Sequence, residues 1–186
     1  LGVQLLRQVV GGWTLGGLMV YQSGALIAVP TSNTVLNNYT FMGATRKNRV
    51  PGEPLYLKDL NCGCIDPYKD LVLNPKAWVE VPEGTYSPAS PYFNDYRQAR
   101  RPSEQFSLGR RFSLAKWKEG MSFQIRAEFF NAFNRMQLAT PSSGNSDAGV
   151  TRDNRGNLTG GFGFINPVGG GNALPRNGQL VARFQF

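Results

Sequence analysis

Alternation of apolar and polar residues is the dominant pattern along this chain. In segment 121–133, apolar side chains occupy every second position up to Phe129, and polar side chains stand between them. Successive side chains of a β-strand point to opposite faces, so a period of two predicts a strand with one apolar and one polar face. The same alternation runs through 104–115 and 178–186, and more weakly through 13–29. The pattern therefore predicts strands near these four ranges.

One charged residue interrupts the apolar face of segment 104–115. Arg110 stands between Leu108 and Phe112, where the alternation calls for an apolar side chain. Two explanations stay open: a β-bulge in this strand, or a position near an interface.

The links between the predicted strands differ greatly in length. Residues 116–120 join the second strand to the third, whereas 30–102 and 134–176 are long, rich in Pro, Gly, Asn and Ser, and weakly periodic. Such loops are rare in compact soluble domains and normal on the outer side of outer-membrane barrels. We therefore expect an all-β fold: an antiparallel up-and-down meander, part of an outer-membrane β-barrel, with two long irregular extracellular loops.

The barrel interpretation also accounts for two tryptophans. If the C-terminus is periplasmic, Trp13 and Trp117 lie together at the inner membrane interface, as an aromatic girdle requires. A soluble β-sandwich module that binds a carbohydrate or another ligand is an alternative, because its strands alternate in the same way. The sandwich would bury Phe123, Ile125 and Phe129 against protein, whereas the barrel would expose them to lipid. A passive or adhesive barrel is a further alternative.

Composition restricts the possible chemistry of the chain more than it restricts the possible folds. The chain has no histidine, which removes His-based acid–base catalysis and His metal ligands. We find no nucleophile beside a base, no paired carboxylates and no metal cluster, so we expect neither enzyme activity nor a cofactor. The net charge of +8 favours anionic neighbours, but no nucleic-acid-binding motif accompanies it, so nucleic acid is not an expected partner. The chain begins at Leu1 without a signal peptide, and we expect a fragment or a processed product.

The two cysteines, Cys62 and Cys64, stand one residue apart. Two thiols without further ligands make a poor zinc site, because structural zinc takes four ligands. We expect a local disulfide in an oxidising compartment first, and free thiols second.

Several segments resemble one family of membrane receptors. Segment 123–134 resembles the penultimate strand of TonB-dependent outer-membrane receptors, above all the Oar-like, carboxypeptidase-regulatory-like receptors common in acidobacteria, and ends in their Asn-x-Phe-Asn step. Further matches follow in order: Gly-Gly-Trp at 11–13, an Asn-Pro loop at 74–78 with Trp in place of Phe, and Phe-Gly-x-Ile at 162–165. The resemblance covers nearly the whole chain.

The resemblance implies a function. Residues 1–186 would be the C-terminal part of a receptor barrel in the bacterial outer membrane, serving TonB-dependent transport of a solute. The implied partners are outer-membrane lipid and lipopolysaccharide, the barrel-assembly machinery and an unknown solute. The TonB complex would act through a plug and other parts of the parent chain outside this sequence.

Three groups of candidate residues follow. The side chains expected to face the lumen are Arg111, Gln124, Arg126, Glu128 and Arg183. The terminal aromatic residues resemble the signal that the assembly machinery reads, and these are Phe184 and Phe186. Guanidinium groups suit phosphate, so contact with lipopolysaccharide is expected from Arg97, Arg100 and Arg101.

Overall fold

The computed structural model describes residues 11–34, 45–168 and 175–186. Its regular structure is β-strand apart from one short 3-10 helix, η1 (Pro75–Ala77), and no helix of the described residues is long and apolar enough to cross a membrane. The chain divides into two compact units. Their described residues are 11–21, 102–136 and 175–186 in the sheet unit, and 22–34, 45–101 and 137–168 in the loop unit.

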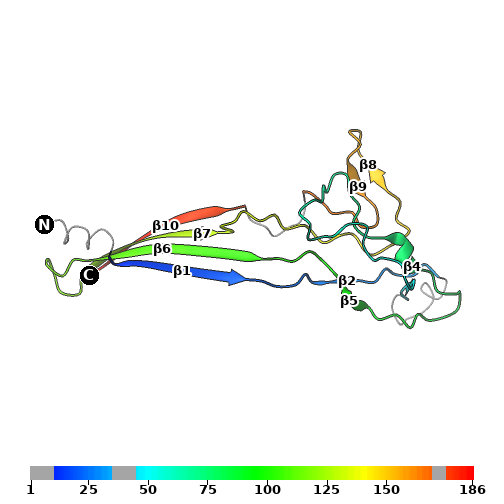
Figure 1. Ribbon diagram of the computed structural model, residues 1–186, viewed down its shortest axis with the longest axis horizontal. Helices are drawn as coiled ribbons and strands as arrows, with labels where there is room; N and C mark the ends of the chain where they lie inside the picture. The colour runs from blue at the N-terminus through cyan, green and yellow to red at the C-terminus, as the bar shows by residue number, and fades with distance from the viewer. Residues whose placement is uncertain (1–10, 35–44, 169–174) are drawn as a thin grey trace. The chain divides into compact units, whose positions relative to one another are not determined.

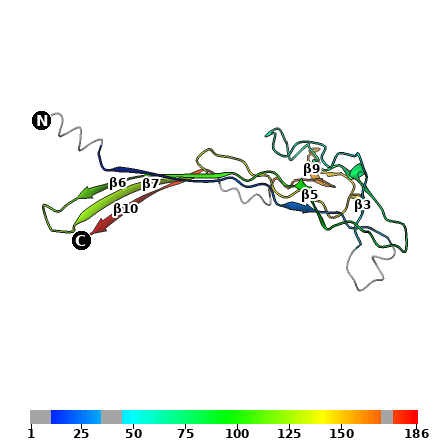
Figure 2. The ribbon, with the colours of Figure 1, turned by 60° about the horizontal axis from the view of Figure 1, so that its bottom comes forward.

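The sheet unit is a four-stranded antiparallel sheet (Figure 1). Its strands lie side by side in the order β1 (Trp13–Val20), β6 (Ser103–Ser113), β7 (Ser122–Phe130) and β10 (Asn177–Gln185). Figure 2 shows β6, β7 and β10 side by side from a second direction. The predicted antiparallel meander is therefore confirmed. The sheet does not close on itself among the described residues, and β1 and β10 are its edges.

The strand register keeps two faces of the sheet chemically distinct. One row of cross-strand partners is apolar and consists of Leu15, Leu108, Ala127 and Leu180. The next row lies on the opposite face and consists of Gly16, Ser107, Glu128 and Gln179. We call these the apolar face and the polar face. The alternation seen in the sequence thus extends across all four strands.

The two ends of the sheet differ in their connections. A short turn joins β6 to β7, in which the Leu114 N–H donates to the Met121 carbonyl (2.9 Å) and Gly120 has a φ of 83°. Because the strands are antiparallel, the C-terminal ends of β1 and β7 lie at the other end of the sheet. Both long connections therefore leave the sheet at the same end, as the barrel interpretation requires.

The strand predicted near 13–29 is in fact two strands in different sheets. β1 stops at Val20, and β2 (Leu26–Ala28) pairs with β5 (Tyr92–Arg97) in the loop unit. Between them, a Cβ on Gly24 would lie 1.9 Å from the carbonyl oxygen of Gln98. The backbones at Gly24 and Gln98 approach each other too closely for a side chain at position 24, so the regular strand does not continue through it.

The loop unit contains more structure than the sequence predicted for its two long connections. Besides β2 and β5, β3 (Asn48–Arg49) pairs with β4 (Trp78–Val79), and β8 (Thr151–Arg152) pairs with β9 (Leu158–Gly160). The unit also has its own hydrophobic core, whose buried members include Ile27, Leu73, Trp78, Tyr96, Phe162 and Ile165.

The Phe-Gly-x-Ile motif is part of this core. Phe162 and Ile165 are both buried, and Gly163 between them has a φ of 81°. A Cβ on Gly163 would lie 2.4 Å from the backbone nitrogen of Leu73. Only glycine permits both this backbone conformation and this close approach.

The Asn-Pro motif begins η1. Asn74 is buried, its side-chain oxygen accepts the Lys76 N–H (3.0 Å), and its amide donates to the Pro54 carbonyl (2.8 Å). An asparagine can donate and accept at once, so it caps the helix and holds a neighbouring segment.

Candidate functional site

The five side chains predicted to face a lumen lie on one face of the sheet, the polar face. Arg111 of β6 is the register partner of Gln124 of β7, and Gln124 is the partner of Arg183 of β10. Arg126 and Glu128 follow on β7 and form an ion pair between Nη2 and Oε1 (2.8 Å). The five residues therefore form one continuous polar cluster across β6, β7 and β10.

Positive charge dominates this cluster. Glu128 pairs with Arg126 and also accepts a hydrogen bond from the Gln179 amide. In the described sheet unit the ion pairs are Arg126–Glu128 and Arg135–Glu104, so Arg111 and Arg183 add charge that no such pair balances. Like charges on neighbouring strands repel each other. This part of the polar face is suited to an anionic group.

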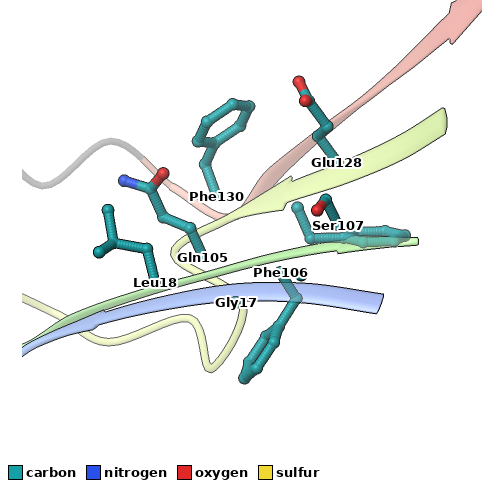
Figure 3. A pocket seen from close by; sticks show the side chains of 9 residues that line it. Gly17, Leu18, Gln105, Phe106, Ser107, Glu128 and Phe130 are labelled. Carbon is teal, nitrogen blue, oxygen red and sulfur yellow. The ribbon is translucent and has the colours of Figure 1, made fainter. Parts of the chain in front are cut away.

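A shallow hollow lies farther along the polar face, toward the end with the long connections. Figure 3 shows Leu18, Gln105 and Phe130 around it, with Ser107 and Glu128 beside them, whereas Phe106 points to the opposite face. The hollow combines apolar side chains with an amide, a hydroxyl and a carboxylate. It can contact a solute that has both polar and apolar groups.

The apolar face remains exposed. Ile125, Phe129 and Leu180 are 37%, 47% and 73% exposed. The Phe129 ring lies over Gly178, where a Cβ would be 3.3 Å from the ring, and the Phe106 ring covers Gly17 in the same way. The two rings cover the glycines of the apolar face, but the face as a whole is not buried. Ile125 and Phe129 are exposed, as the barrel prediction required.

Arg110 interrupts the apolar face without a bulge. The register is continuous through Arg110, which is the partner of both Trp13 and Ile125. Its guanidinium carbon lies 5.4 Å from the centre of the Trp13 ring and 4.7 Å from that of Phe112. The β-bulge explanation is therefore wrong. Cation–π contacts hold this charge among aromatic rings instead.

The Asn-x-Phe-Asn step forms a turn that ends β7 at Phe130, before the predicted end at 133. Asn131 and Asn134 have positive φ angles of 47° and 51°. The Asn131 side chain donates to the Arg135 carbonyl (3.1 Å) and accepts the Arg135 N–H (2.8 Å). Asparagine is one of the few residues that adopts this conformation readily, which explains its presence at both positions.

This turn brings Arg135 to a buried carboxylate. Glu104 is fully buried on the apolar face, and its Oε1 lies 2.8 Å from Arg135 Nε. The Phe133 ring packs edge-on against Phe106, with 5.8 Å between their centres. This pair was not predicted from the sequence, although Glu104 stands as a charge at an apolar position of the alternation.

A second buried charge, also missed, lies in the loop unit. Lys47 is buried, and its Nζ pairs with Glu80 (2.9 Å) and with Asp147. Burial opposes ionisation of Glu80, but hydrogen bonds from Ser32, Lys47 and the Asn33 N–H outweigh it and lower the pKa of the Glu80 carboxyl. The cluster joins segments that are distant in sequence, so no local pattern reveals it.

The three arginines predicted to contact lipopolysaccharide lie in the loop unit, at and after the end of β5. Arg97 Nη1 donates to the Gly24 carbonyl (3.1 Å), and Arg100 donates from N and Nε to Asn61 Oδ1 (2.8 and 3.3 Å). Arg101 Nη2 donates to the side-chain oxygen of a nearby glutamine (3.1 Å). All three therefore bond to neighbouring parts of the loop unit.

The remaining predicted residues are also within the described chain. Cys62 and Cys64 form a disulfide, with both cysteines exposed. Phe184 lies on the apolar face in a row with Phe123, and its ring centre is 6.1 Å from that of Phe186.

Comparison with known proteins adds one finding to this geometry. Residues 2–179 match the family model described as outer membrane beta barrel domain. The chain belongs to this family. No curated protein and no solved structure matches the chain.

The outer membrane beta barrel domain family places the chain in the bacterial outer membrane, as predicted. Strands of such barrels carry an outward apolar band and alternate apolar with polar side chains. The exposed Ile125, Phe129 and Leu180 agree with that arrangement. The family match overturns the soluble β-sandwich alternative. That alternative required Phe123, Ile125 and Phe129 to be buried against protein, whereas Phe123 is half-buried and the other two are exposed.

Proposed function

We propose that this outer membrane β-barrel domain serves TonB-dependent transport of a solute across the outer membrane. The observation that carries the proposal is the folded state of the long connections, which share a hydrophobic core in the loop unit. A loop of fixed shape loses less conformational entropy on binding than an unstructured loop. The loop unit is therefore suited to capturing a solute, and the chain is a transport protein rather than an enzyme.

The polar face supplies the second part of this proposal. Arg111, Gln124 and Arg183, with Arg126 and Glu128, would line the lumen of the barrel, because the opposite face is apolar. A polar lumen provides hydrogen-bonding partners along a solute's path. The motifs at 131–134 and 162–165 support the TonB-dependent assignment through their resemblance to that receptor family.

The test uses the full-length product of the encoding gene in its own cells. Solute uptake from a complex medium is profiled by mass spectrometry after deletion of this gene, or after inactivation of the TonB complex. We expect one solute whose uptake is lost in both strains. Uptake that survives TonB inactivation, together with ion conductance of the purified protein in planar bilayers, would establish a passive barrel instead.

Two partner proposals accompany the transport function. Neutralising Arg97, Arg100 and Arg101 to glutamine should lower barrel stability more in membranes that contain lipopolysaccharide than in phospholipid alone. The matched control neutralises Arg152 and Arg155, which lie elsewhere in the loop unit. If the triple substitution changes barrel stability by the same amount in both membranes, this contact is rejected.

The second partner proposal concerns assembly. Phe184 and Phe186 would form the signal that the barrel-assembly machinery reads. Deleting Phe186 should reduce the amount of assembled barrel in the outer membrane, measured by heat-modifiable migration on gels. Unchanged assembly of the deletion variant would remove this role.

A further inference from the structure

The disulfide of the loop unit joins two cysteines separated by Gly63 alone. A disulfide stabilises a protein mainly by restricting its unfolded chain, and this effect grows with the length of the loop that it closes. The bond between Cys62 and Cys64 closes a minimal loop and joins no distant segments. The bond therefore contributes little to the stability of the folded protein.

The surroundings of the disulfide hold it at the surface. Cys62 and Cys64 are exposed, whereas Leu60 and Ile65 on either side are buried in the hydrophobic core of the loop unit. Gly63 has a φ of 65°, and a Cβ at this position would meet no atom within 4 Å. The two buried anchors fix a tight turn that presents both sulfur atoms to solvent. They would also keep the two thiols near each other after reduction.

The two sulfur atoms are not equivalent. The Cys64 N–H donates to Cys62 Sγ (3.2 Å). A hydrogen bond from a backbone N–H favours negative charge on the accepting atom. Cys62 is therefore the better leaving group, and Cys64 Sγ is the atom that an incoming thiolate attacks.

We propose that Cys62 and Cys64 form a thiol–disulfide exchange site that accepts two electrons from low-molecular-weight thiols. A thiolate RS⁻ attacks Cys64 Sγ, the protein S–S bond breaks, and Cys62 leaves as a thiolate. A second RS⁻ attacks the RS sulfur of the mixed disulfide, which releases RS–SR and leaves Cys64 as a thiolate. The protons of the two RSH molecules finally reside on the two cysteines.

Exposure of the disulfide is what makes this chemistry accessible. Exposed or strained disulfides are the labile ones, whereas shielded structural disulfides resist reduction by glutathione. The exchange is reversible: where RS–SR is in excess, as in an oxidising compartment, it accepts two electrons from the two cysteines, which restores the protein disulfide and releases two RSH. This activity is separate from solute transport and does not rest on it.

The first test measures reduction in the folded protein. Purified full-length protein in detergent is mixed with reduced glutathione, quenched with acid, alkylated and mapped by mass spectrometry, with and without urea. We expect the folded protein to react within about tenfold of the unfolded rate, with the trapped glutathione on Cys64 and the circular dichroism unchanged. Reaction slower by about a hundredfold or more, an adduct mainly on Cys62, or unfolding on reduction would each overturn the proposal.

The second test separates the two sulfurs. Cys64→Ser leaves Cys62 free with its backbone donor, and Cys62→Ser leaves Cys64 free without an equivalent one. Iodoacetamide at neutral pH should alkylate Cys62 several-fold faster than Cys64. Equal or reversed rates would contradict the assigned direction of attack. Protease resistance of the Cys62→Ser/Cys64→Ser double variant verifies that the loop unit folds without the bond, and its loss would show a structural role instead.

Discussion

The sheet unit and the loop unit treat the same residue types in opposite ways. Leu180 of the sheet unit is 73% exposed and Trp117 is 82% exposed, whereas Leu73 and Trp78 of the loop unit are buried. Exposing apolar surface to water costs roughly 25 cal/mol per Å². The apolar face of the sheet therefore requires a lipid environment, whereas the loop unit buries its apolar side chains in a core of its own. One chain thus combines a sheet that exposes apolar side chains and a loop unit that buries them.

The two units agree in how they treat charge. The sheet unit buries Glu104 against Arg135, and the loop unit buries Lys47 between Glu80 and Asp147. In each case the buried charge has a partner of opposite sign, because an unpaired buried charge is strongly destabilising. The difference between the units therefore lies in where apolar side chains are placed.

The largest expected effect comes from truncating the loop core. Trp78→Ala should lower the free energy of unfolding of the loop unit by about 3–5 kcal/mol, because Trp78 is buried against Tyr96 and Phe93. Trp117→Ala is the matched control and should change little. Both are measured by protease resistance of the loop unit. Equal effects of the two substitutions would break the contrast between the units.

The next effect distinguishes the two faces of β10. Leu180→Arg should destabilise the barrel in lipid vesicles by about 2–4 kcal/mol, because it places a charge in the membrane. Val181→Arg, one residue along, should cost about 1 kcal/mol or less, because Val181 lies on the polar face and the added cost is repulsion from Arg126, its partner on β7. Urea unfolding in vesicles measures both variants. A larger loss for Val181→Arg would reverse the assignment of the faces.

Breaking the buried pair of the sheet unit should cost somewhat less. Arg135→Gln should lower the stability of the sheet unit by about 2–3 kcal/mol, less than for a fully buried pair, because the Arg135 side chain is 44% exposed. Adding Glu104→Gln should restore part of this loss, since the uncompensated charge is then gone. Urea unfolding of the single and double variants measures the coupling. A single variant as stable as the unsubstituted protein would contradict the role of this pair.

The smallest expected effect concerns acid stability of the loop unit. The pKa of Glu80 is lowered in the folded state, so its contribution to stability is present above the ordinary glutamate pKa and is lost as the pH falls through the folded value. The change should be about 1 kcal/mol or less, because the Glu80 side chain is 37% exposed and solvent screens it.

Protease resistance measured from neutral pH down to about 3 tests this dependence. Glu80→Gln should flatten the pH dependence, and Glu83→Gln, at an exposed position nearby, should not. A Glu80→Gln variant with an unaltered pH profile would show that the Lys47 cluster does not depend on this carboxylate.

The sheet was predictable from the sequence because its two faces meet different surroundings. A strand with lipid on one face and polar surroundings on the other must alternate, so the pattern reveals both the strands and the face on which Arg111, Gln124 and Arg183 lie. The end of β7 was misplaced because Asn131 turns the chain while Phe133 continues the apparent pattern.

The loop core and its charges were not predictable in this way. Leu55, Trp78 and Phe162 are buried together although they come from separate segments with no common period. The cluster around Lys47 likewise requires Glu80 and Asp147 to meet through tertiary contacts. Local sequence patterns do not reveal such tertiary contacts, so the sequence shows only long, irregular connections.

The assignment of the apolar face to lipid is tested by measuring which solvent each side chain of β10 meets in a membrane. Nitroxide labels are placed singly from Gln179 to Phe184 in the full-length protein, with its native cysteines replaced by serine, in lipid vesicles. We expect a period of two: oxygen accessibility high at Leu180, Ala182 and Phe184, and accessibility to a water-soluble nickel complex high at Gln179, Val181 and Arg183. Absence of alternation, or alternation of the opposite phase, would contradict a lipid-facing apolar face.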